Sequence, residues 1–115
     1  MAFGKRVRFE AVREVAFGGI GAAYAALGVA TTDYTRILSI FNSTNQDAYI
    51  SLNGVTHHIR LASGTGQVFD FTTNKVRDDG FFIPKGTIFY QRHCGAIAPT
   101  SGNIWIQVTY ADGGV

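Results

Sequence analysis

The segment from residue 45 to residue 62 constrains the fold more than any other part of the chain. Apolar side chains take alternate positions on both sides of an Asn-Gly pair: Ala48, Ile50 and Leu52 before it, and Val55, Ile59 and Leu61 after it. Alternation of this kind is typical of a strand with one buried face. Asn53 and Gly54 readily adopt the positive φ angles of a type I′ turn, whose twist matches that of paired strands. The segment is therefore predicted to be a β-hairpin with a tight turn at Asn53-Gly54.

The same pattern continues to the C-terminus. Further strands are predicted at residues 36–41, 67–72, 87–93 and 104–110, separated by turn residues at 42–45, 63–66, 78–80, 84–86 and 99–103. The last strand has the clearest alternation, with Ile104, Ile106 and Val108 on one face and Trp105 on the other, so we expect it to pair centrally or to close a sheet. A total of about seven or eight short strands, at intervals of about ten residues, is typical of a sandwich, a jelly roll or a small barrel.

The N-terminal part has a less regular pattern. Residues 5–15 fit either a strand, with Val7 and Phe9 on one face, or a short helix, and extended structure is favoured. Residues 17–30 are rich in alanine but include four glycines, and each glycine costs about 0.5 to 1 kcal/mol relative to alanine inside a helix. We expect a loop or an irregular strand there, which either packs against a neighbouring subunit or folds tightly on the surface.

Composition limits the classes of function. The 115 residues fit one domain, and the single cysteine, Cys94, excludes an internal disulfide. Only 16% of the residues are charged, against about 25% in typical globular chains; this favours either a surface covered in an assembly or a surface rich in Ser, Thr and Asn. A net charge of +2 is too small to indicate specific binding of nucleic acid. Residues 15–29 are apolar but shorter than the roughly 20 residues of a membrane span, so no membrane contact is expected.

The residues with catalytic potential form no recognisable site. His57 and His58 are neighbours, as are His93 and Cys94, and neighbouring side chains on a strand point to opposite faces. No metal site, cofactor or Cys–His nucleophile is therefore predicted, and the chain is not expected to be an enzyme. Tyr49 and the tryptophan of the last strand are expected to be exposed, where they would stack on a sugar or pack against another sheet or subunit; packing is favoured.

Six segments of the sequence resemble small structural proteins of tailed bacteriophages. They are residues 13–18 (Arg-Glu-Val-Ala-Phe-Gly), 24–28 (Tyr-Ala-Ala-Leu-Gly), 36–38 (Arg-Ile-Leu), 42–44 (Asn-Ser-Thr), 70–74 (Asp-Phe-Thr-Thr-Asn) and 84–90 (Pro-Lys-Gly-Thr-Ile-Phe-Tyr). The resemblance spans most of the chain and lies in motifs of fold and turn. It implies an all-β, jelly-roll-like β-sandwich of short antiparallel strands that is present in many copies and has no catalytic residue.

Together these features predict an extended N-terminal docking arm at residues 1–17 and a single β-sandwich domain at residues 18–115. The arm would contact an adjacent subunit, and adding a strand to an exposed sheet edge is one way in which extended segments bind. The residues expected at this subunit interface are Arg6, Arg8, Phe9, Arg13, Phe17 and Tyr24.

The resulting hypothesis is a non-enzymatic virion protein, assembled in the host cytoplasm, that decorates a capsid and joins neighbouring subunits as a cement protein. Its expected partners are further copies of the chain and other phage virion proteins, either the major capsid protein or portal and tail proteins. Two alternatives stay open. One is a ring component of the head–tail junction or tail, and the other is a receptor- or carbohydrate-binding module that uses Tyr49, Trp105 or the loops.

Overall fold

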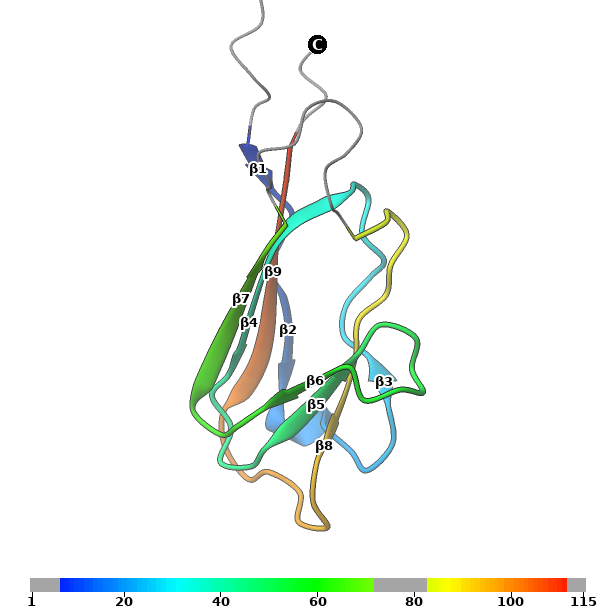
Figure 1. The fold of residues 1–115 in the computed structure, drawn as a ribbon. Helices are drawn as coiled ribbons and strands as arrows, with labels where there is room; N and C mark the ends of the chain where they lie inside the picture. The colour runs from blue at the N-terminus through cyan, green and yellow to red at the C-terminus, as the bar shows by residue number, and fades with distance from the viewer. Residues whose placement is uncertain (1–6, 72–82, 112–115) are drawn as a thin grey trace, which may run out of the picture.

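The structure, a computed structural model, describes residues 7–71 and 83–111. Two antiparallel sheets enclose one apolar core (Figure 1). The elements in chain order are β1 (Val7–Phe9), β2 (Arg13–Ala16), the 3₁₀ helix η1 (Phe17–Gly19), β3 (Ala25–Ala26), β4 (Thr35–Asn42), β5 (Ala48–Ser51), β6 (Ile59–Leu61), β7 (Thr65–Asp70), β8 (Tyr90–His93) and β9 (Asn103–Ala111). The predicted turn at residues 78–80 lies outside the described residues.

β9 is the central strand of the first sheet. Both β1 and β2 pair with one edge of β9, β4 pairs with its other edge, and β7 pairs with β4. The second sheet has the order β3-β8-β5-β6. The central place predicted for residues 104–110 is confirmed.

The strand pairs are nested along the chain. β5 pairs with β6, β4 with β7, β3 with β8, and β1 and β2 with β9, as if one long hairpin had been rolled up. Successive pairs fall in opposite sheets, which is the double-sheet arrangement of a jelly roll. The predicted jelly-roll β-sandwich is therefore confirmed, with nine strands among the described residues because the N-terminal strand is divided in two.

Alternate residues of the strands fill the core. In β9 the side chains of Ile104, Ile106 and Val108 are fully buried, and Trp105 between them is half-buried on the outer face. Other large buried apolar side chains are Leu27, Leu38, Ile40, Ile50, Leu61 and Phe89. Burying one side chain of this size contributes about 1.5 to 3 kcal/mol, so the alternation is the main source of stability.

β5 and β6 form the predicted hairpin, but the predicted two-residue turn is wrong. Residues 52–58 form a longer loop, because the side chain of Asn53 organises the backbone. Its Oδ1 accepts hydrogen bonds from the N–H groups of Val55 and Thr56, both at 2.8 Å. Such local bonds compete with strand pairing, and Val55 is consequently 79% exposed rather than on the core face.

The segment predicted as an arm is extended where the structure describes it. β1 and β2 lie along β9 of the same chain, with Phe9 opposite Thr109 and Glu14 opposite Trp105. Residues 10–12 interrupt the strand between them, and residues 1–6 lie outside the described residues. No helix among the described residues is long and apolar enough to span a membrane.

Candidate interaction surfaces

The residues predicted for a subunit interface do not gather in one patch. Arg8 and Phe9 lie on β1, where Phe9 is 62% exposed, and Phe17, which is 42% exposed, begins η1 beyond the far end of β2. Tyr24 precedes β3 of the second sheet and is half-buried. Arg6 lies outside the described residues. Phe9 and Phe17 are the members of this set that offer apolar surface to a neighbour.

Arg13, also predicted at the interface, has several partners within the chain. Its Nη2 lies 2.7 Å from Glu10 Oε1, and its Nε donates to the carbonyl oxygen of Val29 at 2.9 Å. The other carboxylate oxygen of Glu10 accepts the N–H groups of Thr32 and Asp33 at 3.1 and 3.2 Å. This pair therefore ties the break between β1 and β2 to the loop before β4. A hollow of about 530 Å³ adjoins the pair, and its lining includes Ala11, Val12, Glu14, Gly28 and Tyr110.

Two histidines stabilise separate parts of the backbone. His58 accepts a hydrogen bond at Nδ1 from the N–H of Leu52 at 3.0 Å. His93 is 5% exposed, and its Nδ1 lies 2.7 Å from the carbonyl oxygen of Gly95, so this nitrogen is the donor. Across residues 7–71 and 83–111, no three His, Cys, Asp or Glu side chains gather as metal ligands.

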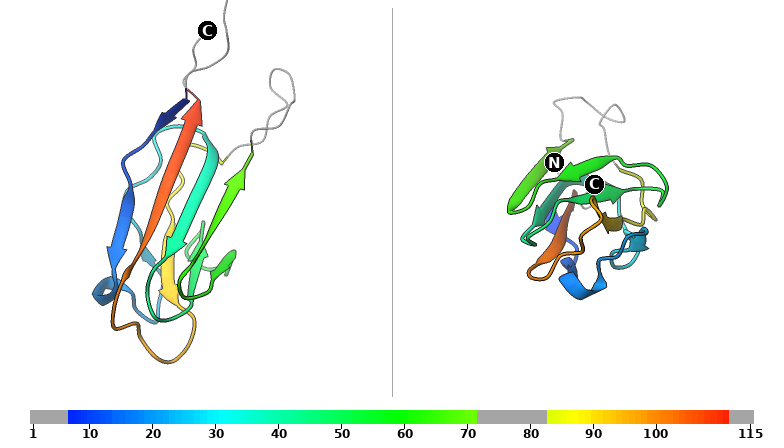
Figure 2. Two further views of the ribbon diagram at one scale, coloured as in Figure 1. Left: turned by 90° about the vertical axis from the view of Figure 1, so that its left-hand side faces the viewer. Right: turned by 90° about the horizontal axis from the view of Figure 1, so that it is seen from below.

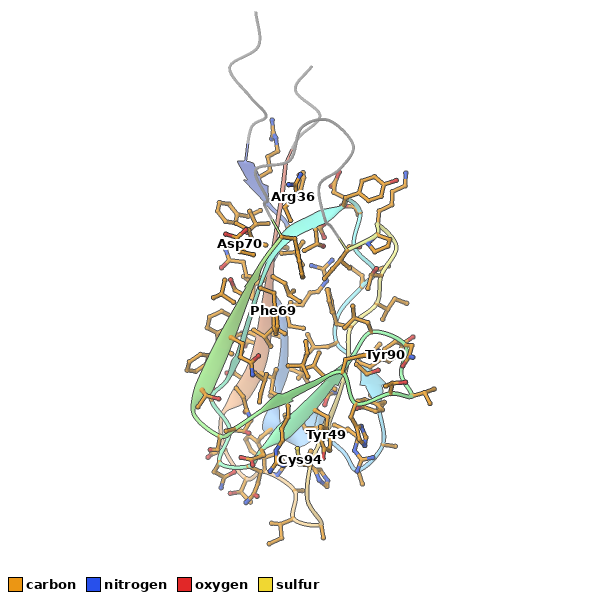
Figure 3. All side chains as sticks on the ribbon, in the orientation of Figure 1. Arg36, Tyr49, Phe69, Asp70, Tyr90 and Cys94 are labelled. Carbon is orange, nitrogen blue, oxygen red and sulfur yellow. The ribbon has the colours of Figure 1, made fainter. Side chains whose placement is uncertain are left out.

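Aromatic and cationic side chains gather on the outer face of the second sheet, around the labelled Tyr49 in Figure 3. The ring of His57 stacks on Tyr49 with centroids 4.0 Å apart and planes inclined by 4°, and the Tyr24 hydroxyl lies 2.5 Å from His57 Nδ1. The guanidinium of Arg92 lies 5.8 Å from the Tyr24 ring centre and 5.9 Å from that of Tyr49. His57 thus fixes the loop of residues 52–58 on the sheet and covers one face of the Tyr49 ring, which reduces the surface that a sugar would need.

A hollow of about 320 Å³ lies beside this cluster, with Asp47, Arg60 and Cys94 in its lining. Burial raises the pKa of the Cys94 thiol, so the thiol stays protonated at neutral pH and is a weak nucleophile. A hydrogen bond from Arg60 at 2.9 Å and another from the N–H of Ser63 lower the pKa of Asp47. The hollow therefore contains a satisfied ion pair and a thiol without activation.

The outer face of the first sheet combines large apolar side chains with polar ones at neighbouring positions, namely Glu14, Ser39, Asp70, Gln107 and Thr109, whereas the solvent side of an antiparallel sheet is usually polar throughout. Phe41 and Trp105 lie opposite each other on β4 and β9, and their rings stack with centroids 5.4 Å apart. The Phe41 ring also covers Gly66 of β7, where an added Cβ would lie 2.7 Å from the ring. Figure 2, left, shows β1, β9, β4 and β7 side by side.

We define the apolar face as the large apolar side chains that point outward from this sheet: Phe9, Ile37, Phe41, Val68 and Trp105. Val68 is 68% exposed. Large apolar side chains grouped on the surface of a folded domain often mark a contact with another molecule. The apolar face is therefore the strongest candidate for an interaction surface in the described part of the chain.

The sequence matches no protein-family model, and a search of curated proteins finds no match. By structure, the chain is similar to a chain of the cyanophage Pam1 capsid asymmetric unit, with a TM-score of 0.54 and 13% identity over 96% of this chain and 88% of that one. It is also similar to a chain of the Bacillus endospore appendages, a family of disulfide-linked pili, with a TM-score of 0.48 and 13% identity over 96% of this chain and 93% of that one. A chain of infectious bursal disease virus, Gx strain, has a TM-score of 0.30 and 16% identity over 97% of this chain and 35% of that one. At 13% identity, the likeness to the cyanophage chain concerns the fold.

Proposed function

We propose that this protein is a non-enzymatic structural subunit of a bacteriophage virion, and specifically a decoration or cement protein that joins neighbouring subunits of a capsid. The observation that carries the proposal is the apolar face on a jelly roll, with Phe41 and Trp105 stacked on the outside of the sheet. Such a surface is unfavourable in water but stabilising when another subunit covers it. The fold likeness to a chain of a cyanophage capsid asymmetric unit supports the same assignment.

The chemistry of the described residues agrees with a role in adhesion. Cys94 has a raised pKa, and each histidine has a local structural partner. A particle repeats each contact many times, so that release of one subunit requires several contacts to break together. Modest interfaces with further copies of the chain and with the major capsid protein are then sufficient to hold the subunit in the particle.

A ring component of the head–tail junction or tail is the alternative that uses the same fold and the same apolar face. The two positions differ in copy number. Quantitative mass spectrometry of purified particles should give a copy number comparable to that of the major capsid protein for a decoration protein, and the small number of one ring for a connector. Absence of the chain from purified particles would overturn both positions.

A variant of the apolar face tests the contact itself. Trp105→Gln removes an outward-pointing aromatic ring between two buried neighbours, so the core is retained. Ile97→Ser is a matched control, because Ile97 is 67% exposed but lies in the loop before β9 rather than on the apolar face. We expect Trp105→Gln to reduce incorporation into particles and Ile97→Ser to leave it unchanged; equal incorporation of both would exclude the apolar face as the contact.

A further inference from the structure

β7 is an open edge of the first sheet. It pairs with β4 on one side and, within the described ranges, with no strand on the other. Two hydrogen bonds show which way the residues of β4 face. The N–H of Ser43, next to β4, donates to the carbonyl oxygen of Asn103 of β9, and the N–H of Phe71, next to β7, donates to the carbonyl oxygen of Arg36 of β4. Because hydrogen bonds alternate in antiparallel pairs, odd-numbered residues of β4 after the register shift at Thr35–Ile37 bond to β9, and even-numbered residues bond to β7.

This alternation fixes the direction of the backbone groups of β7. Gln67 and Phe69 lie opposite Ile40 and Leu38, two even-numbered positions, and therefore bond to β4. Val68 between them directs its N–H and C=O away from the sheet, as Gly66 does. No described residue of the chain pairs with these groups, and they face outward toward the position of a further strand.

The neighbouring edges have protection that β7 lacks. Residues 10–12 interrupt the edge formed by β1 and β2. At the edge of β6, the carbonyl oxygen of Arg60 accepts a hydrogen bond from Gln67 Nε2 at 3.1 Å. β7 is six residues long, keeps a continuous register with β4, and contains no proline, lysine or bulge, which are among the usual devices that prevent edge pairing. Its one charged residue, Asp70, lies at the end of the strand.

We propose that β7 pairs with β7 of a second copy of this chain, antiparallel, across a two-fold axis at Val68. When a strand pairs with its own copy in antiparallel direction, one position lies opposite itself. Val68 meets the requirement for a hydrogen-bonded pair at that position, because its N–H and C=O both point outward. Each Val68 then donates to and accepts from the other, and Gln67 of each copy lies opposite Phe69 of the other copy.

The side chains at the axis fit this arrangement. Val68 is 68% exposed and points to the outer face of the sheet, so the two valines would meet as an apolar cross-strand pair. The contact is isologous and places no charge at the axis. It also joins the apolar faces of both copies into one surface on a continuous sheet. The pairing is a property of the free protein and does not depend on the virion assignment.

Sedimentation equilibrium of the full chain tests the pairing through two substitutions. Val68→Pro removes the outward N–H and no bond to β4, and proline is tolerated on edge strands. It should raise the dissociation constant of the dimer by about tenfold to a hundredfold, since both central hydrogen bonds are lost. Val68→Thr keeps the backbone groups and the branched shape, and is expected to change the constant by less than about fivefold. Equal dimerisation of wild type and Val68→Pro, or a wild type that is monomeric at every concentration, would overturn the proposal.

A charge pair at the axis tests the two-fold geometry and remains informative if the proline variant does not fold. Val68→Lys alone and Val68→Glu alone each place like charges opposite one another, and each should be monomeric. An equimolar mixture places opposite charges together and should restore a dimer. Dimerisation of either variant alone as tight as that of the wild type would show that residue 68 does not face its own copy. An equimolar mixture that contains only monomers would also refute pairing at Val68. Incorporation into particles is measured separately, so failure of this test leaves the virion assignment standing.

Discussion

Replacing Arg13 with alanine should destabilise the fold strongly. The Arg13 guanidinium lies 2.7 Å from the Glu10 carboxylate, with side chains only 5% and 8% exposed, and it also donates to the carbonyl oxygens of Val29 and Ala30 at 2.9 and 3.3 Å. Removing one partner of a buried ion pair costs about 3 to 5 kcal/mol, because the remaining charge loses its counterion without regaining water. We expect a loss near the lower limit, since Glu10 keeps its bond to the N–H of Thr32.

Urea unfolding followed by circular dichroism at neutral pH measures this loss, which should be about 3 kcal/mol in the free energy of unfolding. Arg60→Ala is the matched control. Arg60 and Asp47 also form a close pair, at 2.9 Å, but their side chains are 64% and 36% exposed. An exposed pair is expected to contribute much less than a buried one, because water screens the charges. Equal losses in the two variants would refute the argument that burial determines the strength of the Arg13 pair.

A double substitution distinguishes the stability lost with the contact itself from the stability lost because the Glu10 charge is left buried without a partner. Glu10→Gln with Arg13→Met leaves an amide oxygen to accept the N–H of Thr32 and no buried charge. Replacing both ions of a buried pair costs less than removing one. The double variant should therefore be more stable than Arg13→Ala, and a double variant that is less stable would show that the carboxylate is not the source of the penalty.

Gly102, Asp47 and Cys94 provide three more tests. Gly102→Ala should lower the thermal midpoint of unfolding, because Gly102 has a φ of 83° and an added Cβ would overlap the carbonyl group of Ser43. Gly64→Ala is the control: Gly64 has a φ of 73° but open space around it, so this substitution should lower the midpoint less. The hydrogen bond from Arg60 lowers the pKa of Asp47 below its ordinary value of 3.8, so its stabilisation is complete above that value and is lost as pH falls through the folded-state pKa; acid titration of unfolding should consequently be less steep in Asp47→Asn. The raised pKa of Cys94 predicts slower alkylation by iodoacetamide at pH 8 in the folded chain than in urea, as measured by mass spectrometry, and equal rates would contradict it.

The sequence predicted the strands well because burial of every second side chain is a local signal. Ile104, Ile106 and Val108 are all fully buried, as their spacing required. The turn at Asn53 was predicted in the right place but with the wrong length. An Asn-Gly pair favours a tight turn by backbone conformation alone, and the sequence does not show that the Asn53 side chain will accept two backbone N–H groups instead.

The candidate surfaces could be predicted only in part, because they depend on which strands become neighbours. Arg13 was predicted at a subunit interface from its position in a basic segment. Its partners include the carbonyl oxygens of Val29 and Ala30, sixteen and seventeen residues along the chain, and only the nested topology brings them near. Phe41 and Trp105 are likewise far apart in sequence, and the register of β4 with β9 places them opposite each other.

The sequence also does not show which strand lies at the edge of a sheet and which lies at its centre. β4 and β7 both contain apolar residues at alternate positions, and neither pattern shows which strand has a free side. β7 becomes the edge because the chain crosses from β6 in the second sheet to β7 in the first, so that β6 cannot cover it. The backbone groups of Val68 are thereby exposed next to the apolar face, on the same sheet and in the same register. Among the described residues this jelly roll therefore leaves the edge of β7 unpaired beside exposed apolar side chains, and association with a second copy is the proposal that covers that edge.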